Sequence, residues 1–136
     1  MIIVDTSAWV EFLRGTGSQA NLALRTALAD GETVGVVDVV RLELLAGAGD
    51  DAQLVTVSRL LARGVPIAPL SPSDHDDAAA LYRAARRAGH TVRSLIDCIV
   101  AAVALRLQVP VLARDRDFEV LAAVSPLRLH VAPGGA

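Results

Sequence analysis

The chain has 136 residues, of which 53% are hydrophobic and 21% are charged. This length predicts a single domain spanning residues 1–136, and the composition excludes both a disordered chain and a membrane protein. All 13 basic residues are arginine, and the formal net charge is −2. Chemistry that needs a lysine amine, such as a Schiff base or a Walker A loop, is therefore excluded.

The apolar segments are too short to act as membrane spans or export signals. The longest strictly apolar run in the most hydrophobic region extends from Cys98 to Leu105, whereas a bilayer span needs roughly 18 to 20 residues. Asp5 interrupts the N-terminal apolar run after four residues, which does not match a signal peptide. We expect a cytoplasmic protein whose single cysteine, Cys98, packs in the core.

Short apolar runs alternate along the chain with segments of helical periodicity. In chain order, the patterns predict a strand at residues 2–4, helices at 6–14 and 22–30, a strand at 33–37, helices at 39–46 and 51–63, a strand at 65–70, helices at 74–88 and 95–107, a strand at 110–113, a helix at 117–124 and a strand at 127–131. Asp38 is expected to cap the helix at 39–46. Two prolines place the strand at 65–70 at a sheet edge or in a short ladder.

The strands are almost continuously apolar, which is typical of a parallel sheet covered on both faces. The fold class is therefore α/β, with three α/β/α layers and a central parallel sheet of about five strands. In such sheets, ligands bind outside the carboxyl ends of the strands. Asp5 follows the first strand and Asp115 follows the strand at 110–113, although each acid taken alone is equally well explained as a helix cap or turn residue.

Two further acids lie on helical faces that are otherwise apolar. The helical neighbours of Glu43 include no cation, and Asp97 precedes small apolar side chains on its own face. A buried carboxylate without a partner costs several kcal/mol, so each acid needs either an arginine or a metal ion. Arg93, one turn before Asp97, is the structural alternative for Asp97, and a buried arginine pair is the alternative for Glu43.

Taken together, these four acids predict a metal site built from oxygen ligands. Carboxylates about 4 Å apart repel by roughly 4 kcal/mol per pair at an effective dielectric constant near 20, so a cation is needed among them. The chain has one cysteine and three scattered histidines. A site built from oxygen ligands, without cysteine or histidine, favours Mg²⁺ or Mn²⁺ over zinc.

Four segments of the sequence resemble the acidic motifs of the PIN-domain ribonucleases. They are Ile3-Val4-Asp5-Thr6-Ser7, Glu43-Leu44-Leu45-Ala46-Gly47, Asp97-Cys98-Ile99-Val100-Ala101-Ala102 and Arg114-Asp115-Arg116-Asp117-Phe118. Their order and spacing in a short chain are similar to those of the VapC toxins of bacterial toxin–antitoxin pairs, from residue 2 to about residue 131. One departure is Ala113, since this family often has a hydroxyl residue two positions before the fourth acid.

The resemblance implies a Mg²⁺- or Mn²⁺-dependent endoribonuclease toxin with a PIN-like fold, held inactive by a cognate VapB-type antitoxin. Asp5, Glu43, Asp97 and Asp115 would be the catalytic residues and metal ligands. Ser7 would orient a water molecule or cap a helix. We expect Asp115 to be the principal ligand of the fourth motif and Asp117 to cap the following helix, although Asp117 is close enough to be an additional ligand.

Other polar and aromatic residues carry weaker signals. Arg83, Arg86, Arg87 and His90 follow one helical stripe, which predicts either contact with an RNA backbone or a solvated face. His75 and His130 are expected at the surface. Trp9 and Phe12 are expected in the core or at a protein interface.

Alternative functions remain open from the sequence. A PIN nuclease could act in RNA processing or on structured DNA, and a PIN-fold binding module would have no catalysis. For the toxin, we expect a protein partner that covers apolar surface and offers a basic side chain to the acidic site. Self-association as a two-fold homodimer is also expected.

Overall fold

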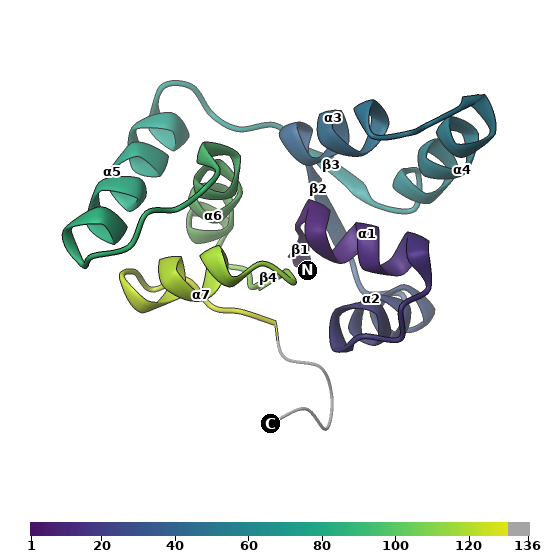
Figure 1. Cartoon of the computed structure of the whole chain (residues 1–136), viewed down its shortest axis with the longest axis horizontal. Helices are drawn as coiled ribbons and strands as arrows, with labels where there is room; N and C mark the ends of the chain where they lie inside the picture. Colours follow the sequence, from purple (N-terminus) through teal and green to yellow (C-terminus); the bar gives the residue numbers. More distant parts are fainter. Residues whose placement is uncertain (131–136) are drawn as a thin grey trace.

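A computed structural model describes residues 1–130 of the chain (Figure 1). Within these residues the chain forms four strands and seven helices. In chain order they are β1 (Ile2–Val4), α1 (Thr6–Arg14), α2 (Gln19–Ala29), β2 (Val34–Val37), α3 (Asp38–Ala46), α4 (Asp51–Leu61), β3 (Val65–Ile67), α5 (Ser73–Arg87), α6 (Leu95–Leu107), β4 (Val111–Leu112) and α7 (Arg116–Ala123). No helix in this part of the chain is long and apolar enough to cross a membrane.

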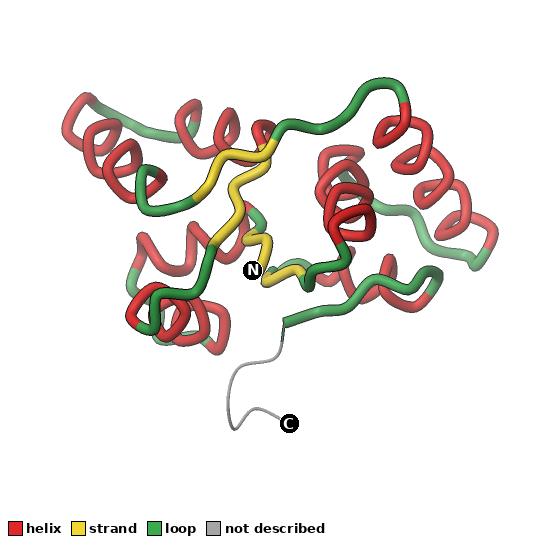
Figure 2. The backbone as a smooth tube through the Cα atoms, turned by 180° about the vertical axis from the view of Figure 1, so that it is seen from behind, coloured by secondary structure: helices red, strands yellow, loops and turns green. Residues whose placement is uncertain are grey.

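The sheet has the strand order β3-β2-β1-β4, and every pair in it is parallel. Figure 2 shows the strands lying between two groups of helices. This arrangement confirms the predicted α/β class and its three layers. The proline-containing strand β3 lies at a sheet edge, as predicted, because proline cannot donate a hydrogen bond to a second neighbour.

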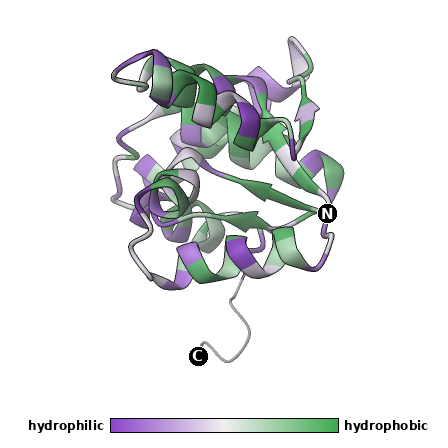
Figure 3. Ribbon diagram, turned by 90° about the vertical axis from the view of Figure 1, so that its right-hand side faces the viewer, coloured by the Kyte–Doolittle hydropathy of each residue, from purple (hydrophilic) through white to green (hydrophobic). Residues whose placement is uncertain are grey.

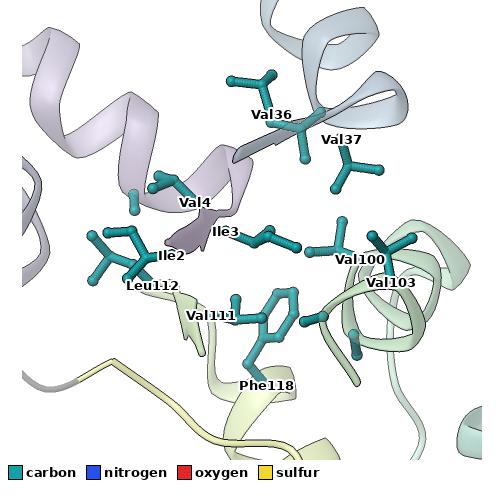
Figure 4. Packing of buried hydrophobic residues seen from close by; sticks show 14 of the residues in the cluster. Ile2, Ile3, Val4, Val36, Val37, Val100, Val103, Val111, Leu112 and Phe118 are labelled. Carbon is teal, nitrogen blue, oxygen red and sulfur yellow. The ribbon is translucent and has the colours of Figure 1, made fainter. Parts of the chain in front are cut away.

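Both faces of the sheet are buried beneath helices. Ile3 lies on the face covered by α6 and α7, where Val100, Val103 and Phe118 surround it (Figure 4). Trp9 of α1 is fully buried, so of its two predicted places, the core or a protein interface, it occupies the core. Cys98 is also fully buried, and Figure 3 shows hydrophobic residues along the strands at the centre of the molecule.

The expected fifth strand is not formed among the described residues. Leu129 makes one isolated parallel bridge to Val111, through bonds in which Val111 N donates to Arg128 O at 3.0 Å and His130 N donates to Val111 O at 2.8 Å. Because β4 has only two residues, its outer edge offers few positions for a further ladder. The expected residue 131 and the expected loose tail at 133–136 lie outside the described residues.

The expected cap of α3 is also wrong. The N-cap residue is Val37, which makes no side-chain cap, and the helix already includes Asp38 in its first turn. An acid in that position still interacts favourably with the positive end of the helix dipole.

A buried ion pair fastens α5 to α6. Asp74 is fully buried, and Arg106 donates to its carboxylate from Nε at 3.0 and 3.1 Å and from Nη2 at 3.0 Å. Leu70 N also donates to Asp74 at 2.7 Å. Burial alone would raise the pKa of Asp74, but these hydrogen bonds and the charge of Arg106 lower it below its usual value.

We predict that Asp74→Ala destabilises the fold by on the order of 3 kcal/mol, because it leaves the guanidinium of Arg106 without its partner. Asp76→Ala is the matched control, since Asp76 is an exposed acid in the same first turn of α5. Urea unfolding followed by circular dichroism measures both variants. Equal midpoints for the two variants would contradict the structural role of this pair.

Candidate active site

The parallel sheet brings the first and fourth predicted acids to the same end of the sheet, where the carboxyl ends of the strands lie. Strands β1 and β4 are neighbours, with Ile3 opposite Val111 and Val4 opposite Leu112. Asp5 directly follows β1 and is the N-cap of α1, and Asp115 is the N-cap of α7. The carboxyl ends of the two strands therefore present both acids at the same end of the sheet.

Ser7 links these two strand ends. Its backbone N and its Oγ both donate to Asp5 Oδ2, at 3.0 and 2.7 Å, while Ser7 Oγ accepts from Arg114 N at 2.8 Å. Asp5 rather than Ser7 caps the helix. The bonds from Ser7 fix one oxygen of Asp5, while Asp5 Oδ1 is buried without a hydrogen-bond partner among residues 1–130.

Asp5 is almost completely buried, and burial raises its pKa above the usual value. The hydrogen bonds from Ser7 oppose this rise, whereas the nearby charge of Glu43 adds to it. The second oxygen of Asp5 is thus an unused acceptor in a place where negative charge is unfavourable. A cation would relieve that cost.

Three carboxylates form a tight group beside the strand ends. Asp97 from α6, Asp115 and Asp117 each offer one oxygen, and these oxygens lie within 4.8 Å of one another. Asp97 is 6% exposed, and its Oδ2 has no hydrogen-bond partner within the described part of the chain. Burial, followed by the charges of Asp5 and Asp115, raises the pKa of Asp97 to about 8.

Asp117 has a different place from the one expected. The side chain that caps α7 is Asp115, whose Oδ1 accepts from Asp117 N at 2.9 Å. Asp117 is buried and turns towards the loop before α6, where its Oδ2 accepts from Arg93 N at 2.9 Å. The expected cap role of Asp117 is therefore wrong, and Asp117 joins the carboxylate group.

Arg93 does not pair with Asp97, the partner that sequence spacing had offered. Its guanidinium lies beside Asp115, with Nη2 to Oδ1 at 3.3 Å, and beside Asp117, with Nε to Oδ2 at 3.5 Å. No ion pair to Asp97 is found among residues 1–130. Asp97, whose pKa is raised by burial, therefore has no arginine beside it in this part of the chain.

Glu43 lies at the margin of the site. It is half-buried on α3, and its Oε1 accepts from Thr6 Oγ1 at 2.7 Å. The buried arginine pair that was its alternative explanation is not seen within the described residues. Glu43 therefore adds negative charge next to Asp5 but is outside the group of three carboxylates.

The donor set fits a hard divalent ion. Every ligand atom in the group is a carboxylate oxygen, which is the chemistry that Mg²⁺ and Mn²⁺ prefer. The buried oxygens of Asp5 and Asp97 that lack hydrogen bonds are available to a cation or to water molecules around it. The sequence indicates Asp117 only as a possible additional ligand, because its burial and its contact with Arg93 are not visible in the spacing of the strand-end acids.

The predicted arginine stripe and the two remaining histidines are outside the carboxylate group. Arg83, Arg86 and Arg87 are exposed on α5, and Arg86 lies over the ring of Tyr82 at 5.7 Å. Their predicted contact with RNA stays a prediction. His75 is exposed as expected, whereas His130 is half-buried.

His130 also lines a cavity that sequence reasoning missed. The cavity has a volume of about 720 Å³ and reaches Asp115, with Arg114 and Arg116 on its wall.

Comparison with known proteins identifies the family of the chain. The model of the PIN domain family matches residues 2–124. Ribonuclease VapC11 of Mycobacterium tuberculosis is 42% identical over 130 residues, which cover 94% of this chain and 96% of that protein.

Solved structures show the same fold at lower identity. VapBC2 of Rickettsia felis, bound to a promoter DNA fragment, matches with a TM-score of 0.76 and 16% identity, covering 96% of this chain and 98% of the other. VapC20 of Mycobacterium tuberculosis matches with a TM-score of 0.63 and 21% identity, covering 94% and 99%. From the family match and the identity to VapC11, the chain belongs to the PIN-domain family and, within it, to the VapC ribonucleases.

Proposed function

We propose that the chain is an endoribonuclease that depends on a divalent metal ion, Mg²⁺ or Mn²⁺. One observation carries the proposal: the buried carboxylate of Asp97 has an oxygen without a hydrogen bond and lies beside Asp115 and Asp117, with no arginine on it among residues 1–130. A structural role would require a hydrogen-bond or ion-pair partner for that buried oxygen. A non-catalytic module would have no reason to keep it.

Each acid has a distinct part in the proposed chemistry. Asp97, Asp115 and Asp117 would hold the ion, which when bound supplies positive charge to the phosphodiester oxygens and makes a nearby water molecule more acidic. Asp5 keeps one oxygen fixed by Ser7 and leaves Oδ1 to orient that water. Glu43, which accepts a hydrogen bond from Thr6, adds negative charge near Asp5 and would favour cation binding.

The substrate class follows from the relatives. VapC11 is named a ribonuclease and VapC20 is described as a toxin that cleaves the sarcin–ricin loop. We propose RNA as the substrate of this chain on the basis of its 42% identity to VapC11. The RNA-processing alternative has no separate support in the described residues.

A second cavity supports a protein partner of the VapB type. It has a volume of about 590 Å³ between α1, α3 and α4, and is lined by apolar side chains that include Val10, Leu13 and Leu44. Glu43 and Thr6 also line this cavity, so it reaches the margin of the acidic site. An apolar antitoxin segment ending in a basic side chain would match both, and R. felis VapBC2 was solved as a complex.

We predict that RNA cleavage requires Mg²⁺ or Mn²⁺ and that Asp97→Asn lowers its rate at least about 100-fold while the fold persists. The purified chain, freed of any antitoxin, is incubated with total RNA in the presence of either ion or of a chelator. Asp77→Asn, an exposed acid on α5, is the control and should keep the rate. Equal cleavage with and without chelator would end the metal proposal.

We also predict a pH-dependent cost of Asp97 in the metal-free protein. Since the folded chain holds the Asp97 proton up to about pH 8 and the unfolded chain loses it near its usual pKa, the free energy of unfolding falls as pH rises between these values. In chelator, Asp97→Asn should be more stable than the wild type by on the order of 2 kcal/mol at pH 8. The difference should shrink towards pH 5. A variant that is less stable at both pH values would show that Asp97 has a structural partner.

For the partner, we predict that Leu13→Asp weakens the complex with the cognate antitoxin at least about tenfold, because it places a charge on the apolar wall of the cavity. Leu107→Asp is the matched control, since Leu13 and Leu107 are 37% and 36% exposed and Leu107 is on α6, outside the cavity lining. Calorimetry with the purified antitoxin compares the two. Equal losses would place the antitoxin elsewhere.

A further inference from the structure

Arg93 lies in the loop between α5 and α6, and its side chain contacts the carboxylate group. Its guanidinium reaches Asp115 Oδ1 at 3.3 Å and Asp117 Oδ2 at 3.5 Å. These are two of the three side chains that form the proposed metal centre. A guanidinium and a divalent ion at this place would neutralise the same negative charge.

The contacts of Arg93 differ from those of a structural ion pair in the same molecule. Arg106 makes bonds of 3.0 to 3.1 Å to the fully buried Asp74, and its side chain is 30% exposed. The side chain of Arg93 is 76% exposed and its contacts are longer. Exposed pairs of this kind contribute little to stability, so the guanidinium of Arg93 can leave at small cost.

The backbone keeps the carboxylates in place when that side chain leaves. Arg93 N donates to Asp117 Oδ2 at 2.9 Å, and Asp117 N donates to Asp115 Oδ1 at 2.9 Å. Neither bond involves the guanidinium. The group of acids is therefore held independently of the side chain of Arg93.

We propose that the guanidinium of Arg93 is an internal counter-cation that exchanges with the divalent ion at Asp115 and Asp117. The inference rests on the proposed metal centre and adds a residue that sets its affinity. Without an ion, Arg93 reduces the repulsion between the two acids. When an ion binds, the guanidinium moves into solvent while its backbone N–H stays on Asp117.

The direction in which one substitution changes the affinity for the ion distinguishes this exchange from a supporting role. If Arg93 competes with the ion, Arg93→Gln should bind the ion more tightly; if it positions the acids for the ion, the same substitution should bind more weakly. Arg116→Gln is a matched control, because Arg116 is an exposed arginine next to Asp115 that makes no ion pair within residues 1–130. It changes the net charge equally without touching the carboxylate group.

The experiment is calorimetric titration of Mn²⁺ into the full chain at low ionic strength. We expect Arg93→Gln to lower the Kd for Mn²⁺ roughly three- to tenfold and Arg116→Gln to change it less than about twofold. Arg93→Lys, which keeps the charge but lacks the planar fork, should fall between the wild type and Arg93→Gln. In chelator, the melting temperature of Arg93→Gln should be lower than that of the wild type, and saturating Mn²⁺ should remove the difference.

An unchanged or weaker Kd in Arg93→Gln overturns the exchange, as does an equal gain in Arg116→Gln. If Arg93→Gln does not fold, a Kd for Arg93→Lys weaker than that of the wild type overturns it as well. Absence of Mn²⁺ binding to every protein overturns the metal centre together with the exchange. Binding to the wild type with no gain in the Arg93 variants overturns the exchange alone.

Discussion

Repulsion between carboxylates that the sheet holds together is the constraint from which the rest of the site follows. Parallel pairing of β1 with β4 places Asp5 and Asp115 at the carboxyl ends of the two strands. The buried Asp97 adds a third acid at the same place. The strands cannot separate these charges without losing their register. The neighbouring contacts, from Ser7 on Asp5 to Arg93 on Asp115, each reduce part of that cost.

Two of the acids serve the fold and the site together. Asp5 and Asp115 cap α1 and α7, so the free N–H groups at each helix start orient a carboxylate and offset part of its charge. The helices are in turn anchored by fully buried aromatic side chains, Trp9 in α1 and Phe118 in α7. Packing of the core therefore sets where the oxygens point, and a substitution at either aromatic residue would disturb the site through the helix start.

The sequence was informative where one strand and the next residue decide the outcome. The parallel sheet and the strand-end positions of Asp5 and Asp115 follow from local apolar runs, and they are found in the structure. The contact of Asp117 with Arg93 was not predictable, because it is a bond from Arg93 N that spans 24 residues. The prediction of a fifth strand was wrong for a similar reason. Pairing at Leu129 is limited by the length of the neighbouring strand β4 and not by the residues around Leu129.

We propose that the carboxylate group at the carboxyl ends of the strands is a divalent metal centre. Anomalous diffraction from crystals of the full chain grown with Mn²⁺ tests it most directly. We expect a manganese peak in contact with carboxylate oxygens of Asp97, Asp115 and Asp117, with the guanidinium of Arg93 moved away. A fully occupied peak elsewhere, or none at saturating Mn²⁺, would contradict the claim.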